Sequence, residues 1–326
     1  MSEPLLQVEN LKIEFRTARG TLQALSGISF DVLPGEVFGL VGETGCGKTV
    51  TGLGVLRLVP KPGKITAGRI LLRGDDLLAK SDKEMQQIRG GQIAMIFQDP
   101  SSSLNPVFTV GSQIAHVIRQ HQNVSADAAK RQTVATLESV GLPDAERLMD
   151  SYPHELSGGM QQRAMIAMAL ACQPALLIAD EPTTALDVTI KAQILTLLRE
   201  LQARFNLALL LITHDLGVVA EMCDRLAVLY AGHVVETGTM TDIFSAPQHP
   251  YTRGLMSAIP RRDSRGKPLT AIRGTVPSNP GALVGCPFKS RCDLVFERCR
   301  AERPPLMRAE KNHLSACWLQ SDGGAR

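Results

Sequence analysis

Eight residues near the start of the chain constrain its fold more than any other stretch. They follow an apolar run at 37–41 and are Gly42, Glu43, Thr44, Gly45, Cys46, Gly47, Lys48 and Thr49. The pattern G-x-x-x-x-G-K-[ST] needs a strand before it and a helix after it, because its glycines turn backbone N–H groups toward a phosphate. The sequence therefore predicts a buried strand, a phosphate-binding loop and a helix that begins near Lys48, as in α/β proteins.

The side chains of this loop predict a nucleoside triphosphate and a magnesium ion as ligands. The N-terminus of a helix carries a partial positive charge, which favours phosphate. In loops of this pattern the lysine reaches the β- and γ-phosphates, and the Ser/Thr hydroxyl coordinates Mg²⁺. We therefore expect Lys48 to hold the phosphates of the nucleotide and Thr49 to be a ligand of Mg²⁺.

Two adjacent acids after a second apolar strand supply further chemistry. Asp180 and Glu181 follow the apolar run at 176–179, and α/β sheets bind ligands at the carboxyl ends of their strands. Asp180 is expected to complete the Mg²⁺ shell, and Glu181 to polarise an attacking water as general base. His214 follows another strand, at 208–213. It is either a structural histidine or a contact of the γ-phosphate.

A second glycine-rich helix start lies further along the chain, in the sequence LSGGMQQR at 156–163. Ser157 is a residue type that caps helices well. Gly158 and Gly159 leave the first helical N–H groups accessible to an anion. A chain with one nucleotide motif therefore has two phosphate-binding helix ends.

Together these motifs resemble those of the ATP-binding-cassette (ABC) ATPases, over about residues 5–245. In that family the LSGG segment closes over the nucleotide held by another subunit's phosphate loop, so the resemblance implies ATP sites shared between two subunits. Phe15 takes the place of the tyrosine that stacks on adenine, and Gln98 matches the glutamine that contacts Mg²⁺ and the attacking water. Asp187 matches the loop that crosses the dimer interface, and His214 matches the switch histidine.

The fold class expected is α/β, namely an ABC-type nucleotide-binding domain. The resemblance implies a core sheet with the phosphate loop, an N-terminal antiparallel β-subdomain and a helical signature subdomain. Apolar residues at helical spacing in 110–121 and 126–140 predict that the helical subdomain occupies about 100–160. We expect the ATPase domain to span 1–245, and a small loop-rich extension that contains cysteines to span 246–326.

The composition favours a cytosolic globular protein. No apolar run approaches the roughly 18–20 residues that a bilayer-spanning helix needs. The N-terminus lacks the basic and apolar regions of a secretory signal, so reduced thiols are expected. Residues 260–326 hold 13 Lys/Arg and 6 Asp/Glu, a net charge of +7. This indicates either a solvated surface or a face for anionic lipid or an acidic partner.

Longer stretches resemble one branch of the family, the ATPases of dipeptide, oligopeptide and nickel importers, most of all its dipeptide members. They read FQDP at 97–100, SLNP at 103–106, EPTTALDVT at 181–189 and HPYT at 249–252. The resemblance implies an ATP-hydrolysing translocase subunit that powers peptide import. It implies that this subunit lies peripherally at the cytoplasmic face of the bacterial inner membrane. Nickel, glutathione and antimicrobial peptides are alternative substrates, and the direction of transport rests on the resemblance alone.

The same resemblance implies the partners of the chain. They are two transmembrane permease subunits, a second ABC ATPase subunit that is identical or paralogous, and an extracytoplasmic substrate-binding protein. Nucleic acid is not expected. A cassette protein that acts on DNA or ribosomes is the rival hypothesis, but only 58 residues separate Gln98 from Ser157, without sustained heptads, and the chain has one phosphate loop. A redox-sensing regulator is a third hypothesis, which strong DNA binding at physiological salt would favour.

Cys46 departs from this branch, which usually has serine at that position. It is either a small residue that fits a crowded loop or a reactive thiol whose pKa is lowered by the helix N-terminus. In the second case a maleimide blocks ATP hydrolysis, and MgATP protects against it.

Four cysteines near the C-terminus form the last candidate site: Cys286, Cys292, Cys299 and Cys317. A reduced cytosol argues against disulfides, which leaves metal binding or plain burial. The intervals of five, six and seventeen residues match neither zinc ribbons nor the familiar ferredoxin spacings. The resemblance implies a [4Fe–4S] cluster, which some members of this branch hold, with a structural role; zinc and no metal are the alternatives.

Overall fold

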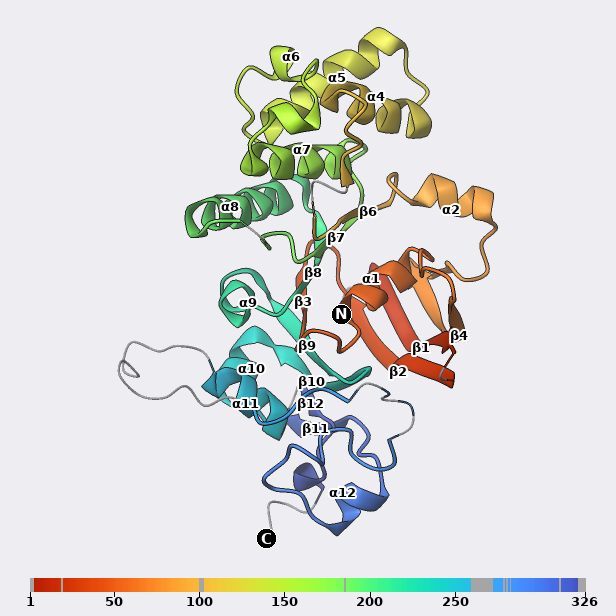
Figure 1. The fold of residues 1–326 in the computed structure, drawn as a ribbon, viewed down its shortest axis with the longest axis vertical. Coiled ribbons are helices and arrows are strands. Elements are labelled where there is room, and N and C mark those ends of the chain that lie inside the picture. Colours follow the sequence, from red (N-terminus) through yellow and green to blue (C-terminus); the bar gives the residue numbers. More distant parts are fainter. Residues whose placement is uncertain are drawn as a thin grey trace. The chain divides into compact units, whose positions relative to one another are not determined.

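The structure of the protein is a computed structural model. It describes residues 3–18, 20–99, 103–184, 186–258, 272–277, 279, 281, 283–310 and 312–321. The chain forms two compact units, of which the first comprises 3–78 and 212–326 and the second comprises 79–211 (Figure 1). The predicted start of the helical subdomain at residue 100, and residues 259–271 of the predicted extension, lie outside the described residues.

An antiparallel sheet of four strands begins the first unit. Its order is β2 (Gly20–Val32), β1 (Leu6–Thr17), β4 (Gly63–Leu72) and β5 (Asp75–Asp76). In β1 the apolar Leu6, Val8, Leu11 and Ile13 are buried, and a register shift after Val8 breaks the strict alternation. One apolar and one polar face are typical of antiparallel sheets. This sheet is the predicted N-terminal β-subdomain.

A second sheet in the same unit contains the strand that leads into the phosphate loop. Within this unit its strands follow the order β11 (Met307–Glu310), β12 (His313–Ser315), β10 (His233–Thr239), β9 (Arg225–Tyr230) and β3 (Val37–Val41). β3 and β9 are parallel, and the other neighbours are antiparallel. The C-terminal region thus adds two strands to this sheet. The sequence predicted only a loop-rich extension there.

The helices of the first unit are short. They are α1 (Lys48–Val55), α9 (Leu216–Met222), α10 (Met240–Ser245), α11 (Pro250–Ser257), α12 (Glu297–Ala301) and the 3₁₀ turn η4 (Trp318–Gln320). The buried carboxylate of Glu236, in β10, links this strand to the segment before α11 and to β12. It accepts hydrogen bonds from the N–H groups of Gln248 (2.7 Å) and His249 (2.9 Å), and its Oε1 lies 2.6 Å from Nε2 of His313. Burial alone raises the pKa of Glu236, but these hydrogen bonds hold it below its ordinary value.

The second unit is mainly helical. Its strands are β6 (Ile93–Ile96) and β7 (Leu176–Asp180), which are parallel, and β8 (Ala208–Thr213), which lies beside β7 and leads into the first unit. Its helices are α2 (Asp82–Ile88), α4 (Val110–His121), α5 (Ala126–Ser139), α6 (Ala145–Leu148), η1 (Pro153–Glu155), α7 (Gly158–Leu170) and α8 (Val188–Phe205). The helices predicted at 110–121 and 126–140 are α4 and α5. Among the described residues, no helix combines the length and apolar character needed to cross a membrane.

His233 at the start of β10 predicts a pH dependence of stability. Its side chain is buried and its Nε2 has no hydrogen-bond partner among the described residues. Burial, assisted by the charge of Arg303, lowers the pKa of His233 from 6.5 to about 3. The unfolded chain therefore binds this proton in a pH range where the folded chain does not. Where the unfolded chain binds one proton more than the folded chain, the free energy of unfolding decreases by about 1.4 kcal/mol for each unit by which the pH falls.

We expect the His233→Leu variant to lose this contribution. Its unfolding free energy, measured with urea between pH 5.5 and 4.5, should fall by about 1.4 kcal/mol less per pH unit than that of the native chain. Identical slopes for the two chains would show that His233 does not titrate as its burial requires.

Candidate nucleotide-binding site

The predicted phosphate loop has the backbone conformation that its chemistry requires. Gly42 and Gly47 have φ values of 156° and 111°, and a Cβ on Gly42 would lie 2.2 Å from the carbonyl oxygen of Leu229. A larger residue is therefore excluded at Gly42. Helix α1 begins at Lys48 without a hydrogen bond from a capping side chain, so the N–H groups of its first turn are suited to an anion.

Lys48 lies inside the curl of this loop. Its ammonium is buried and donates hydrogen bonds to the carbonyl oxygens of Gly42 (2.8 Å) and Glu43 (3.1 Å). Thr44 and Thr49 are exposed at the opening of the loop. The loop thus combines a cation, backbone N–H groups and an accessible hydroxyl, the groups that bind a nucleotide's phosphates and its Mg²⁺.

Cys46 is fully buried beneath the loop. A Cβ on Gly42 would lie 2.8 Å from its Sγ, so the space around the sulfur is already filled. Burial raises the pKa of the Cys46 thiol to about 11, although the charge of Lys48 opposes this. The thiolate is the reactive form of cysteine. The structure therefore contradicts a lowered pKa at Cys46 and favours a small residue that fits a crowded loop.

We expect a maleimide to leave Cys46 unmodified in the folded protein at pH 7, because the thiol is buried and protonated. Mass spectrometry after brief labelling checks this, with the urea-unfolded chain as the control in which Cys46 must react. Modification of Cys46 in the folded chain, prevented by MgATP, would restore the reactive-thiol hypothesis.

Two other predicted residues also lie in the first unit. Phe15 is near the end of β1 and is partly exposed, and a Cβ on Gly63 would lie 2.6 Å from its ring. One edge of the ring therefore packs on that glycine. His214 follows β8 and is exposed, and the next residue, Asp215, caps α9 by accepting a hydrogen bond from Gly217 N–H at 2.8 Å. The predicted position of His214 at a strand end is confirmed.

The second unit holds the two predicted acids and Gln98. Strand β7 ends at Asp180, which is 2% exposed. Oε2 of Glu181 accepts hydrogen bonds from Nε2 of Gln98 at 3.2 Å and from Oγ1 of Thr184 at 2.9 Å. The structure thus brings Gln98 and Glu181 together. Glu181 has a φ of 47°, a left-handed conformation that costs a non-glycine residue roughly 1–3 kcal/mol and is concentrated at functional sites.

The LSGG segment also lies in the second unit, at the start of α7. Oγ of Ser157 accepts a hydrogen bond from Met160 N–H at 3.3 Å, so Ser157 is the predicted helix cap. Ser157 and the glycine after it are exposed. A Cβ on Gly159 would lie 3.1 Å from Ile190, and Asp187, which caps α8, accepts a hydrogen bond from Ile190 N–H at 3.0 Å. The starts of α7 and α8 therefore lie side by side.

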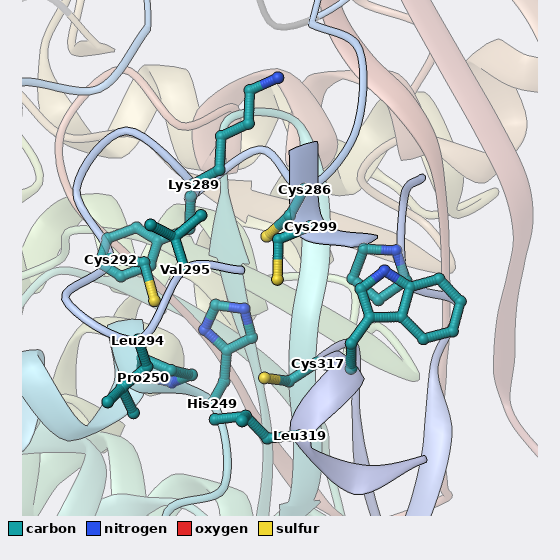
Figure 2. A pocket seen from close by; sticks show the side chains of 13 residues that line it. His249, Pro250, Cys286, Lys289, Cys292, Leu294, Val295, Cys299, Cys317 and Leu319 are labelled. Carbon is teal, nitrogen blue, oxygen red and sulfur yellow. The ribbon is translucent and has the colours of Figure 1, made fainter. Parts of the chain in front are cut away.

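The four C-terminal cysteines line one cavity. Figure 2 shows their sulfur atoms facing a common space beside the ring of His249. That space has a volume of about 10 Å³, which is about enough for one water molecule. Burial, with a smaller contribution from the charges of the neighbouring cysteines, raises the pKa of Cys286 and Cys317 to about 11.

The residues around this cavity do not form a site for a single metal ion. Within the described ranges, no group of three or more His, Cys, Asp or Glu side chains is arranged to hold one. The described residues therefore show no preformed site for the expected [4Fe–4S] cluster or for the zinc alternative.

Two residues without a role predicted from the sequence contact the phosphate loop. The hydroxyl of Tyr251 accepts a hydrogen bond from Glu43 N–H at 2.9 Å. The guanidinium of Arg291 donates to both carboxylate oxygens of Glu43, at 2.6 and 3.0 Å. Tyr251 stands in the HPYT stretch at 249–252 and Arg291 directly precedes Cys292, but neither position indicates a partner 208 or 248 residues away.

Comparison with known proteins agrees with these motifs. Residues 25–184 match the family model "ABC transporter", and residues 235–299 match "Oligopeptide/dipeptide transporter, C-terminal region". The dipeptide transport ATP-binding protein DppD of Bacillus subtilis (strain 168) is 50% identical over 98% of this chain and 95% of its own. The oligopeptide transport ATP-binding protein OppD of the same strain is 48% identical over 97% of this chain and 88% of its own.

A solved structure shares the fold. It is the dimeric structure of MJ0796, a bacterial ABC transporter cassette, with a TM-score of 0.64 and 25% identity over 72% of this chain and 98% of that one. The identity with DppD extends over nearly the full length of both chains. The chain therefore belongs to the ABC transporter family, with the C-terminal region of its oligopeptide/dipeptide transporters.

Proposed function

We propose that this chain is the ATP-hydrolysing subunit that powers import of dipeptides and oligopeptides through a membrane ABC transporter. The observation that carries the proposal is the similarity to dipeptide and oligopeptide transport ATP-binding proteins over nearly the whole chain. It includes the C-terminal region beyond the match to the general transporter model. A shared region outside the ATPase motifs favours a shared transport system, because the motifs themselves serve transporters of every substrate.

The phosphate loop supports the binding of ATP. In this proposal its N–H groups and the Lys48 ammonium hold the phosphates, and Phe15 stacks on adenine. Mg²⁺ prefers oxygen ligands, and the oxygens of Thr49, Gln98 and Asp180 would hold it. When bound, the ion would supply positive charge that offsets the charge of the phosphates.

Glu181 is the general base of the proposed hydrolysis. Its hydrogen bonds from Gln98 and Thr184 fix the carboxylate in one orientation. The carboxylate accepts a proton from the water that attacks the γ-phosphate, and ADP leaves. His214 contacts the γ-phosphate in the same step.

A second subunit completes each ATP site. Ser157, Gly158 and Gly159 present a helix N-terminus, and its exposed residues suit the γ-phosphate held by another chain. Asp187 lies beside this helix end and belongs to the same interface. Two subunits therefore close on two ATP molecules, and hydrolysis separates them again.

The proposed complex lies at the inner membrane of a bacterium. Two permease subunits cross the bilayer, and this chain, with a second ATPase subunit, binds them peripherally at the cytoplasmic face. An extracytoplasmic binding protein delivers the peptide. The closing motion of the two ATPase subunits is passed to the permeases.

Reconstitution tests this function. We expect the chain to co-purify from membranes with two permease subunits, and the complex in liposomes to hydrolyse ATP faster when binding protein loaded with a dipeptide is added. The complex with Glu181→Gln, which should not take up peptide, is the matched control. Stimulation by nickel, glutathione or an antimicrobial peptide alone would reassign the substrate, and stimulation by DNA alone would overturn transport.

We propose in addition that Cys286, Cys292, Cys299 and Cys317 hold a [4Fe–4S] cluster with a structural role. The support is that all four thiols line one cavity and that cysteine thiolates are the ligands of such clusters. After anaerobic purification we expect iron and an absorbance band at about 400 nm. A colourless chain without iron would contradict the cluster, and zinc in its place would identify the other metal.

A further inference from the structure

The anchoring of Glu43 shows that the phosphate loop is held from outside itself. Glu43 is the second residue of the loop, directly after Gly42. Its carboxylate forms a bidentate ion pair with Arg291, whose side chain is 3% exposed. Bidentate, charge-assisted hydrogen bonds of this kind are strong and directional. The C-terminal region therefore determines where the Glu43 side chain lies.

Arg291 is itself held in place. Its Nε donates to the carbonyl oxygen of Arg273 at 2.7 Å, and its Nη2 donates to that of Gly274 at 3.3 Å. The guanidinium also lies over the rings of Tyr230 (5.7 Å) and Phe288 (5.9 Å). A planar cation with so many contacts loses little further freedom when it binds a carboxylate. Arg291 is thus a preorganised anchor.

A second anchor acts on the backbone of the same residue. Glu43 N–H donates to the hydroxyl of Tyr251, whose side chain is completely buried. The Tyr251 ring packs on Tyr230 at 4.6 Å and on Phe288 at 5.4 Å. Both the side chain and the N–H of Glu43 are therefore bound by residues outside the loop, while its carbonyl oxygen accepts a hydrogen bond from Lys48.

The geometry points to Arg291, together with Tyr251, as a positioning residue for nucleotide binding: it holds the phosphate loop in its binding conformation before the nucleotide arrives. A loop that is already ordered pays less conformational entropy on binding. Arg291 directly precedes Cys292, so the cysteine-bearing segment also carries the anchor of the ATP site. This inference rests on the proposed binding of nucleotide phosphates by this loop.

The affinity for MgADP, measured by calorimetry on the full chain, tests the inference without hydrolysis. We expect Arg291→Met, which keeps the apolar stem of the side chain, to lower the affinity for MgADP about 10-fold. Arg291→Lys keeps the charge but not the planar guanidinium that binds both carboxylate oxygens, and it should lower the affinity less. The KM for ATP should rise by the same factor, with a much smaller change in kcat. Arg300→Met, which removes an exposed arginine of the same region, is the matched control and should leave both unchanged.

Glu43→Gln gives an independent test that leaves the C-terminal region intact. If Arg291→Met does not fold, the result for Glu43→Gln alone tests the inference. Glu43→Gln should weaken MgADP as Arg291→Met does, and the double variant should be no weaker than either single variant. MgADP affinities within twofold of the native chain for folded Arg291→Met or for Glu43→Gln would overturn the inference. Lys48→Ala separates the two claims: if it too binds MgADP normally, the loop is not the phosphate site.

Discussion

We expect the Glu181→Gln variant to bind MgATP as the native chain does and to hydrolyse it about 10²- to 10⁴-fold more slowly, because a positioned general base contributes that factor. The amide keeps the shape of the side chain and its hydrogen bond from Thr184, but it cannot take a proton from water. Phosphate release under saturating MgATP measures the loss. In the proposed mechanism hydrolysis separates the two subunits, so the variant should also accumulate as a closed dimer when MgATP is present.

Glu200→Gln is the control for this substitution. Glu200 is an exposed acid on α8 of the same unit, so the change removes the same charge at a distance in sequence from the predicted motifs. Its hydrolysis rate should equal that of the native chain. Rapid hydrolysis by Glu181→Gln would remove Glu181 from the mechanism, and equal losses in both variants would indicate a general effect of charge.

The second large effect is expected at Ser157. In the proposed mechanism this residue contacts the nucleotide held by the partner subunit and not the nucleotide held by its own phosphate loop. Ser157→Arg places a long cation on the exposed start of α7, where the partner's nucleotide must approach. We expect MgATP to bind the isolated chain normally, while hydrolysis falls by about 10²-fold or more because the γ-phosphate loses its second set of donors.

Ser125→Arg is the matched variant. Ser125 is also exposed, and its Oγ caps α5 by accepting a hydrogen bond from Ala128 N–H at 3.2 Å. Both substitutions therefore remove a serine cap, which costs about 0.5–2 kcal/mol of stability. Normal hydrolysis by Ser125→Arg and loss in Ser157→Arg would assign the effect to the dimer interface. Equal losses would assign it to helix stability.

Local patterns predicted much of the fold and of the candidate site. The loop at 42–49 has glycine where φ must be positive, and Ser157 caps α7, because both features depend on neighbouring residues alone. The helices at 110–121 and 126–140 followed from apolar spacing for the same reason. The hydrogen bond between Gln98 and Glu181, 83 residues apart, was not predicted; the family resemblance implied only that Gln98 contacts the attacking water, which Glu181 was expected to polarise.

Features made by distant residues were not predictable in this way. The pairing of Arg291 with Glu43 joins residues 248 apart. Where β12 adds to β10, Glu236 contacts His313, 77 residues further along the chain. The raised pKa of Cys46 reflects packing against other parts of the unit, which outweighs the local effect of a helix N-terminus. The left-handed φ of Glu181 opposes the local preference of glutamate.

In the proposed mechanism a single chain binds ATP but cannot hydrolyse it, because half of the catalytic site comes from a neighbouring subunit. The direct test is the hydrolysis rate per chain over a range of protein concentrations, with the monomer fraction determined by sedimentation in the same MgATP buffer. The account predicts that the rate per chain follows the dimer fraction and vanishes for the monomer. A monomer that hydrolyses ATP at the full rate, with or without Ser157→Arg, would contradict it.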